Sequence, residues 1–287
     1  KAQVNESTNR ANSNPPAVVS SFDNKQAESV KPKPADLSGF SSVKIKRTDR
    51  KSKFTLKIDV EYPQLKNAKS SGKIEFNQYV KKHVDEQISD FIEFLLEKNK
   101  EMKSGSKSEY EINLSYDVEY VSNDFISVLM NWNGFSGYLN MDYFPLTINY
   151  DLKKSRQIKL EDLFEPNAKY LENLSEVSRK KLRRTCLSCG CGDGINAGDP
   201  LPENLVEENN RQNANTDVNA NSALRDGWMN RGTEAKEENF NNWSVTTEGL
   251  KMTFGEYQVG PGCIGIIHIV IPFSDLQSVL RKDLNFN

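Results

Sequence analysis

Histidine is scarce in this chain of 287 residues, and its scarcity excludes several kinds of active site. His83 and His268 are the only two, which do not support a Ser/His/Asp or Cys/His arrangement or a histidine-rich site for a divalent metal. His83 lies beside apolar positions of a predicted helix, and His268 lies in an isoleucine-rich segment. We therefore expect His83 to be a packed or half-exposed helix residue and His268 to be a core or sheet-face residue with a hydrogen-bond partner. We predict no catalytic residue, no cofactor and no metal site.

Other absences narrow the class of protein further. No run of 18 apolar residues is present, so no membrane-spanning helix is predicted, and the start lacks the basic-then-apolar pattern of a signal peptide. The formal net charge of -2 gives no field that would attract nucleic acid. Walker-type and dinucleotide-binding glycine motifs are also missing. We expect no nucleic-acid partner, and membrane contact only through an anchor upstream of Lys1.

The composition changes along the chain and suggests three parts. Residues 1–39 are rich in Asn, Ser, Pro and Lys without apolar periodicity, so we expect a flexible tether. Residues 40–134 are predicted to form an N-terminal α+β subdomain, and residues 135–287 a C-terminal one. A stretch at about 185–238 is rich in Asn, Gly and Glu and is too long for an ordinary connection, so it is interpreted as an insertion.

Apolar periodicity predicts the secondary structure. Strict alternation indicates half-buried strands over 54–62 and 110–120, followed by strands at 125–132 and 143–152. Between the first two strands, apolar residues recur every three or four positions and predict a long helix over 74–98. A helix over 168–184, strands over 250–254 and 264–271, and a final helix complete the prediction. The strands are mostly linked by hairpins, which favours an α+β fold with antiparallel sheets, packed helices, two subdomains and a disordered N-terminal tether.

Four cysteines leave several alternatives open. Cys186, Cys189 and Cys191 lie within six residues of one another, and Cys263 lies far along the chain. Our preferred interpretation is a disulfide to Cys263 that fastens the insertion. Free thiols, a disulfide within the cluster and a zinc site completed by the fourth thiolate are the alternatives.

Two stretches, Asn149–Phe164 and Asn239–Pro272, read as strand, turn and strand with no recognisable chemistry. With Glu61–Leu65 upstream, they resemble a bacterial extracytoplasmic module of two adjoining domains of unknown function. That module occurs as the sensor region of the anti-sigma-V factor RsiV, which binds lysozyme, and as the non-catalytic N-terminal part of the peptidoglycan deacetylase PdaC. The resemblance extends from about Phe40 to Leu284.

Three departures limit what the resemblance implies. Many members carry a Gly-Gly-Ala-His-like turn, whereas Gly134–Tyr138 contains no histidine. The cysteine-bearing insertion is not typical of the family. The chain also lacks a sigma-binding segment with a membrane span and the Asp/His metal motifs of a deacetylase, so neither activity is carried over.

The resemblance implies a non-enzymatic, exported binding or sensor module at the cell envelope, in a periplasmic, surface-anchored or secreted location. Its expected ligand is a lysozyme-like protein or peptidoglycan. The alternative is an envelope polysaccharide hydrolase or a deacetylase-associated enzyme, which would need acidic side chains that converge in a deep pocket. Because turns beside a rigid sheet often carry function, we predict ligand contacts at Tyr138, Asn140, Tyr257 and Pro261.

Overall fold

A computed structural model describes residues 37–101, 107–137, 142–184 and 226–284. The described residues belong to one compact unit, which extends over 33–287. The predicted tether lies almost entirely outside the described ranges. None of the helices within these ranges is both long enough and apolar enough to cross a membrane.

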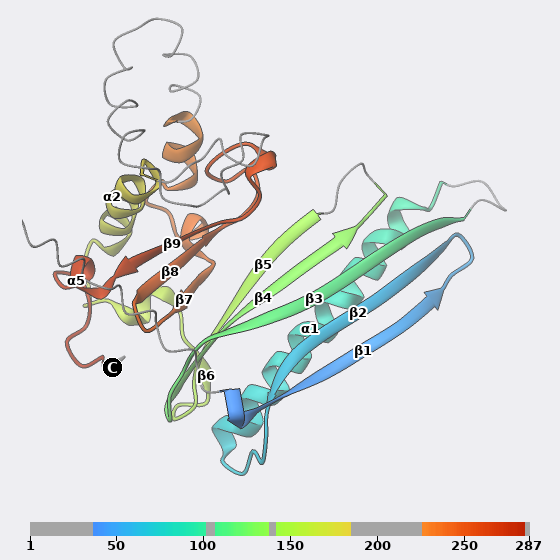
Figure 1. Ribbon diagram of the computed structural model, residues 1–287, viewed down its shortest axis with the longest axis horizontal. Coiled ribbons are helices and arrows are strands. Elements are labelled where there is room, and N and C mark those ends of the chain that lie inside the picture. The colour runs from blue at the N-terminus through green and yellow to red at the C-terminus, as the bar shows by residue number, and fades with distance from the viewer. Residues whose placement is uncertain (1–36, 102–106, 138–141, 185–225, 285–287) are drawn as a thin grey trace, which may run out of the picture. The chain divides into compact units, whose positions relative to one another are not determined.

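The first half of the chain folds into a six-stranded sheet whose strands follow in the order β1-β2-β3-β4-β5-β6 (Figure 1). All neighbouring pairs are antiparallel except β2 and β3, which are parallel. The helix α1 (Ser71–Lys98) connects these two strands. It returns the chain to the end of the sheet at which β2 begins, so β3 runs in the same direction as β2. The strands are β1 (Phe40–Arg50), β2 (Phe54–Leu65), β3 (Ser108–Val121), β4 (Phe125–Phe135), β5 (Asp142–Asp151) and β6 (Arg156–Gln157).

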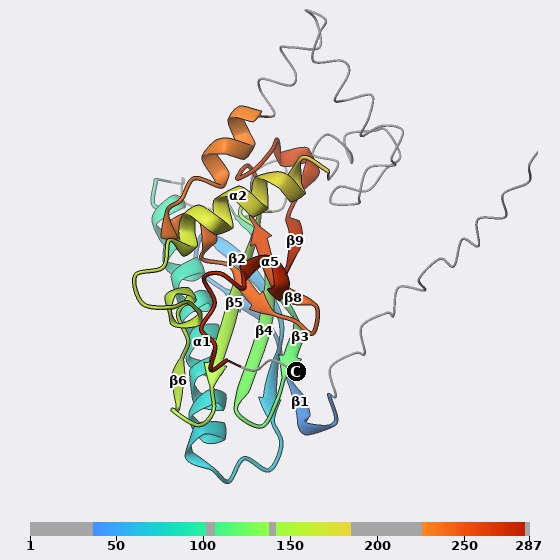
Figure 2. The ribbon, with the colours of Figure 1, turned by 90° about the vertical axis from the view of Figure 1, so that its left-hand side faces the viewer.

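Helix α1 covers one face of this sheet, as both ribbon views show (Figures 1 and 2). Its buried side chains recur at helical spacing and meet the inward residues of the strands in one hydrophobic core. Gly72 permits the closest approach, because a Cβ at this position would lie 1.7 Å from the carbonyl oxygen of Leu152. The predicted long helix and the predicted alternation of β2 are confirmed. The buried stripe of the helix consists of Gly72, Phe76, Val80, Val84, Ile88 and Leu95.

The second half forms an antiparallel sheet of three strands, β7 (Trp243–Val245), β8 (Gly249–Phe254) and β9 (Ile267–Pro272). Helices α2 (Tyr170–Leu182) and α5 (Phe273–Leu276) contact β9. A second hydrophobic core lies among these elements and includes Tyr120 and Phe125 from the first sheet. Short 3-10 helices fill the connections: η1 (Leu37–Gly39), η2 (Leu160–Leu163), η4 (Glu237–Phe240) and η5 (Gly262–Ile264).

Buried polar side chains join the edge of the second sheet to the first sheet. The free edge of β7 presents two N–H groups and one carbonyl that have no strand partner. The N–H of Trp243 donates to Thr147 Oγ1 at 3.1 Å, and the N–H of Val245 donates to Ser127 Oγ at 3.1 Å. The Asn149 amide donates to the carbonyl of Trp243 at 2.7 Å and accepts from the Ser127 hydroxyl at 2.6 Å. These side chains satisfy an edge that would otherwise be open to another strand.

A second set of contacts joins the two ends of the predicted insertion. Arg179 on α2 donates from Nε to Thr233 Oγ1 at 3.0 Å and from Nη2 to the carbonyl of Asn230 at 3.4 Å. Thr233 in turn donates to the carbonyl of Met229 at 2.7 Å. The chain therefore leaves α2 and returns at helix 226–232 next to the same side chain.

The expected α+β class is confirmed, with two sheets and packed helices. The parallel β2–β3 pair differs from a pure meander. Strands β5 and β6 belong to the first sheet, beyond the boundary expected at 134/135. Where the two subdomains divide remains a prediction.

Candidate functional site

A cavity of about 260 Å³ lies where the two stretches that carry the sequence resemblance meet. One wall comes from the end of β6 and η2, and the other from η4 and the start of β7. Aromatic rings, two carboxylates, a lysine and two amides share the lining, so the cavity combines apolar surface with hydrogen-bonding groups. Its lining residues are Gln157, Ile158, Lys159, Leu160, Glu161, Tyr170, Glu237, Phe240, Asn241 and Trp243.

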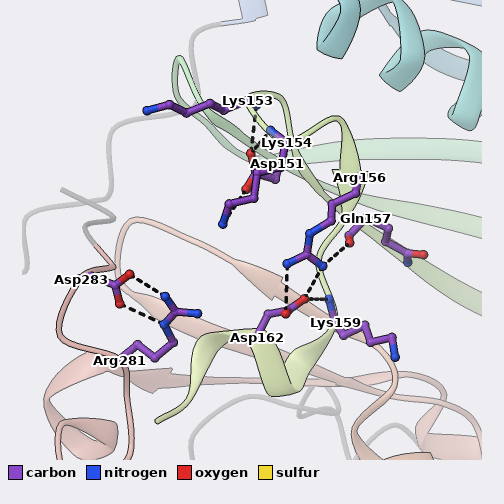
Figure 3. A network of polar contacts seen from close by, with 9 residues as sticks. All are labelled: Asp151, Lys153, Lys154, Arg156, Gln157, Lys159, Asp162, Arg281 and Asp283. Atoms are coloured by element: carbon purple, nitrogen blue, oxygen red, sulfur yellow. Dashed lines mark hydrogen bonds and ion pairs between the residues drawn. The ribbon is translucent and has the colours of Figure 1, made fainter. Parts of the chain in front are cut away.

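The first wall is held by a network of charges around Asp162 (Figure 3). The Arg156 guanidinium binds both carboxylate oxygens of Asp162, at 2.9 and 3.1 Å. The N–H of Lys159 donates to the same carboxylate at 2.9 Å, which caps η2. The bond from Arg156 is the main cause that lowers the pKa of Asp162 below its usual value. This bidentate pair fixes the turn after β6 against η2 and so fixes the first wall.

Stacked rings support the base of the cavity. Tyr170 lies almost parallel to Phe164, with ring centroids 4.6 Å apart and an interplanar angle of 10°. Burial raises the pKa of Tyr170, and the negative charges of Glu237 and Glu161 raise it further. The hydroxyl of Tyr170 keeps its proton at neutral pH, and its hydrogen bond to the Glu237 carboxylate, which also raises the pKa, links the two walls.

The second wall is positioned by the polar contacts between the sheets. Trp243 is held at both backbone groups, by Thr147 and by Asn149, and is only 3% exposed. Phe240 is also buried, at 1% exposure, while Asn241 between them is exposed. The wall therefore combines one exposed amide with two fixed, buried rings.

A chain of hydrogen bonds reaches the cavity from α1. His83 Nε2 lies 2.8 Å from the hydroxyl of Tyr79, and that hydroxyl donates to Gln157 Oε1 at 2.6 Å. Gln157 is one of the cavity-lining residues. The side chains of Gln157 and Lys159 extend to the same side of the segment that joins β6 to η2 (Figure 3).

This arrangement suits the binding of a polar ligand with apolar faces. The partly exposed ring of Tyr170 can contact the apolar face of such a ligand, and the amide, ammonium and carboxylate groups can pair with its polar atoms. Within the described ranges, no three His, Cys, Asp or Glu side chains are grouped as metal ligands would be.

The residues predicted as ligand contacts lie elsewhere. Tyr138 and Asn140 fall outside the described residues. Tyr257 is 59% exposed with a positive φ of 61°, and its ring lies 6.5 Å from that of Trp228. Pro261 is exposed just before η5. None of the four lines the cavity, so their role as ligand contacts remains a prediction.

The other residues singled out in the sequence are His83, His268 and the four cysteines. His268 on β9 has the expected hydrogen-bond partner, since its Nδ1 lies 3.0 Å from Thr253 Oγ1. His83 lies half-buried on α1, as expected for a helix residue beside the apolar stripe. The cysteine cluster lies outside the described residues, as does the side chain of Cys263. The disulfide therefore remains a prediction.

Two protein-family models match the chain. Residues 50–137 match the model described as "Deacetylase PdaC", and residues 161–274 match "Protein of unknown function (DUF3298)". The chain is also 22% identical, over 228 residues, to peptidoglycan-N-acetylmuramic acid deacetylase PdaC of Bacillus subtilis strain 168. That alignment covers 79% of this chain and 40% of the deacetylase, so the chain spans less than half of this relative's length.

A solved structure has the same fold. A DUF3298 family member from Bacteroides fragilis NCTC 9343 has a TM-score of 0.54 at 17% identity, over 85% of this chain and 94% of that protein. A DUF3298 family protein from Pseudomonas aeruginosa PAO1 has a TM-score of 0.49 at 10% identity, over 86% and 96% of the two chains. This chain is a two-domain module that joins a PdaC-like part to a DUF3298-like part and resembles the N-terminal region of PdaC.

Proposed function

We propose that this protein is a non-enzymatic binding module of the cell envelope, and that its cavity takes a peptidoglycan-related ligand. The observation that carries the proposal is the meeting of the two resembling stretches at one cavity, with rings and polar groups on facing walls. A saccharide or short peptide offers the apolar faces and the hydrogen-bonding groups that such a lining can recognise. The match to a protein named as a peptidoglycan deacetylase supports this ligand class and an extracytoplasmic location.

Co-sedimentation with purified, insoluble peptidoglycan tests the proposal directly. Glu161→Ala and Asn241→Ala each remove an exposed polar group of the lining without removing a buried side chain. We expect the wild type to sediment with peptidoglycan and the double variant to sediment several-fold less. Glu109→Ala is the matched control, because this exposed glutamate lies on β3 outside the cavity. Equal retention of all three proteins would place binding elsewhere and would contradict the use of this cavity.

Two further arms separate the alternatives. Immobilised lysozyme replaces peptidoglycan in a parallel assay, since a protein partner is the other ligand that the resemblance implies. Retention by lysozyme alone would replace the proposed ligand class. Mass spectrometry of peptidoglycan fragments after incubation tests for an enzyme: loss of acetyl groups or cleavage of the glycan would overturn the non-enzymatic proposal.

Tyr257 and Pro261 form a second proposed contact surface. Tyr257 neighbours Trp228, whose ring carries the Arg231 guanidinium 4.8 Å from its centroid. Exposed aromatic rings of this kind suit stacking against a sugar. Tyr257→Ala in the same co-sedimentation assay tests whether this surface contributes beyond the cavity, and unchanged retention would remove it.

A further inference from the structure

The hydrogen-bond chain that ends at the cavity runs from His83 through Tyr79 to Gln157 in this structure. A phenol hydroxyl carries one proton, and Tyr79 uses its proton for Gln157 Oε1. The Tyr79 oxygen can then only accept from His83, which requires a proton on Nε2 of the ring. His83 therefore donates to Tyr79, and Tyr79 donates to Gln157.

This direction determines which end of the Gln157 amide is left for a ligand. The amide oxygen is engaged with α1, whereas no bond of the NH₂ group to another described residue competes with a ligand. Because the amide is planar, an oxygen fixed toward Tyr79 leaves the NH₂ group turned away from α1. Gln157 is among the residues that line the cavity.

We propose that His83 and Tyr79 are positioning residues that fix the Gln157 amide with its NH₂ group toward the cavity, where it donates to a carbonyl or carboxylate oxygen of the ligand. The proposal rests on the proposed function and names the chemistry that the cavity recognises. An acetamido group or a peptide carbonyl provides such an oxygen. A ligand with only donor groups at this point would be disfavoured, since two donors would face each other.

The surroundings of Tyr79 keep this chain in place. The Tyr79 ring lies 4.6 Å from the His83 ring and 5.6 Å from the Tyr150 ring, centroid to centroid. Burial, with smaller contributions from Tyr150 and Glu86, raises the pKa of Tyr79 to about 12, so its hydroxyl keeps the proton that Gln157 accepts. The hydroxyl is held between two partners and cannot rotate without losing one of them.

The protonation state of His83 affects the direction of these hydrogen bonds. Glu86 Oε2 lies 4.0 Å from His83 Nδ1, and Lys82 is the other charged neighbour. A protonated ring donates from both nitrogens and therefore permits only the direction seen here. A neutral ring can also carry its proton on Nδ1, which would reverse the chain and turn the oxygen of Gln157 toward the cavity. Recognition of an acceptor group should thus strengthen as the pH falls through the pKa of His83.

Nuclear magnetic resonance of the whole chain tests the positioning without a ligand. The side-chain NH₂ signals of Gln157 are assigned by their loss in Gln157→Glu and are followed from pH 8 to pH 5. We expect them to shift with the same midpoint as the His83 ring, and to lose this dependence in Tyr79→Phe. Tyr116→Phe is the matched control, because it removes a hydroxyl that bonds Ser42 outside the cavity. Gln157 signals that ignore the His83 titration in the wild type would overturn the positioning.

Binding of a soluble muramyl dipeptide, which carries acetamido and peptide carbonyls, tests the ligand chemistry. Gln157→Met keeps the length of the side chain without the amide, and the loss of one neutral hydrogen bond of about 1 kcal/mol corresponds to roughly five-fold weaker binding. Tyr79→Phe should weaken binding less, since the amide remains but is free to turn. Unchanged binding by Gln157→Met overturns the inference. No binding by the wild type overturns the proposed function and the ligand chemistry together, while the resonance experiment decides the positioning separately.

Discussion

Replacement of Asn149 by alanine should strongly destabilise the protein, because this side chain joins the two sheets. Asn149 is only 2% exposed and makes two hydrogen bonds, one from Ser127 and one to the carbonyl of Trp243. The substitution leaves that carbonyl and the Ser127 hydroxyl buried without these partners. Each such group costs about 1–3 kcal/mol. The expected loss for the two groups together is therefore roughly 2–6 kcal/mol, a large fraction of the 5–15 kcal/mol typical of a folded protein.

Urea denaturation followed by tryptophan fluorescence measures this loss, since Trp243 lies at the contact. Asn131→Ala is the matched control on β4: its amide donates to Asp117 at 2.8 Å in a solvent-accessible pair, so we expect a change below about 1 kcal/mol. A double-mutant cycle with Ser127→Ala should show a coupling of about 0.5–3 kcal/mol, because the two side chains share one network. An Asn149→Ala variant as stable as Asn131→Ala would refute the reasoning.

Three further predictions concern other parts of the molecule. Gly72→Ala should lower the melting temperature markedly, because the new Cβ would lie 1.7 Å from the carbonyl oxygen of Leu152. Gly227→Ala is the matched control: its Cβ would meet no atom within 4 Å, and alanine should stabilise helix 226–232 by about 0.5–1 kcal/mol. Burial lowers the pKa of His83, so the unfolded state binds more protons than the folded state. The free energy of unfolding should therefore decrease as the pH falls below the usual pKa of histidine. Urea denaturation at several pH values should show a weaker decrease for His83→Gln. Lys251 and Glu119 pair at 2.6 Å with side chains only 18% and 13% exposed, so Glu119→Gln should cost about 1–3 kcal/mol by urea denaturation, more than the loss of an exposed pair.

The fold could be predicted wherever a pattern is local. The alternation of Phe54 to Tyr62 and the stripe from Phe76 to Leu95 both follow from which residues must be buried, and the structure confirms both. The parallel pairing of β2 with β3 could not be predicted in the same way. A long helix between two strands returns the chain so that both strands run in the same direction, but no local pattern indicates that β2 and β3 are direct neighbours.

The sequence identified the two stretches that form the candidate site, but not that they meet. The stretches around Leu160 and Trp243 carry the sequence resemblance, but nothing in either one indicates that they face each other across a cavity. Their meeting depends on Thr147 and Asn149, which read as ordinary strand residues and act as a substitute for a neighbouring strand. The signal that could have revealed them is the presence of polar side chains at positions of a strand that should be buried.

The contact between Arg179 and Thr233 bears on how far the length of the chain between α2 and helix 226–232 can change. The described residues on either side of 185–225 are already held together, so the entropy of closing a flexible connection between them would rise only with the logarithm of its length. A doubling costs about 0.6 kcal/mol. The chain can therefore lengthen or shorten between α2 and helix 226–232 at little cost in stability, and can gain new residues there while the cavity walls stay where they are.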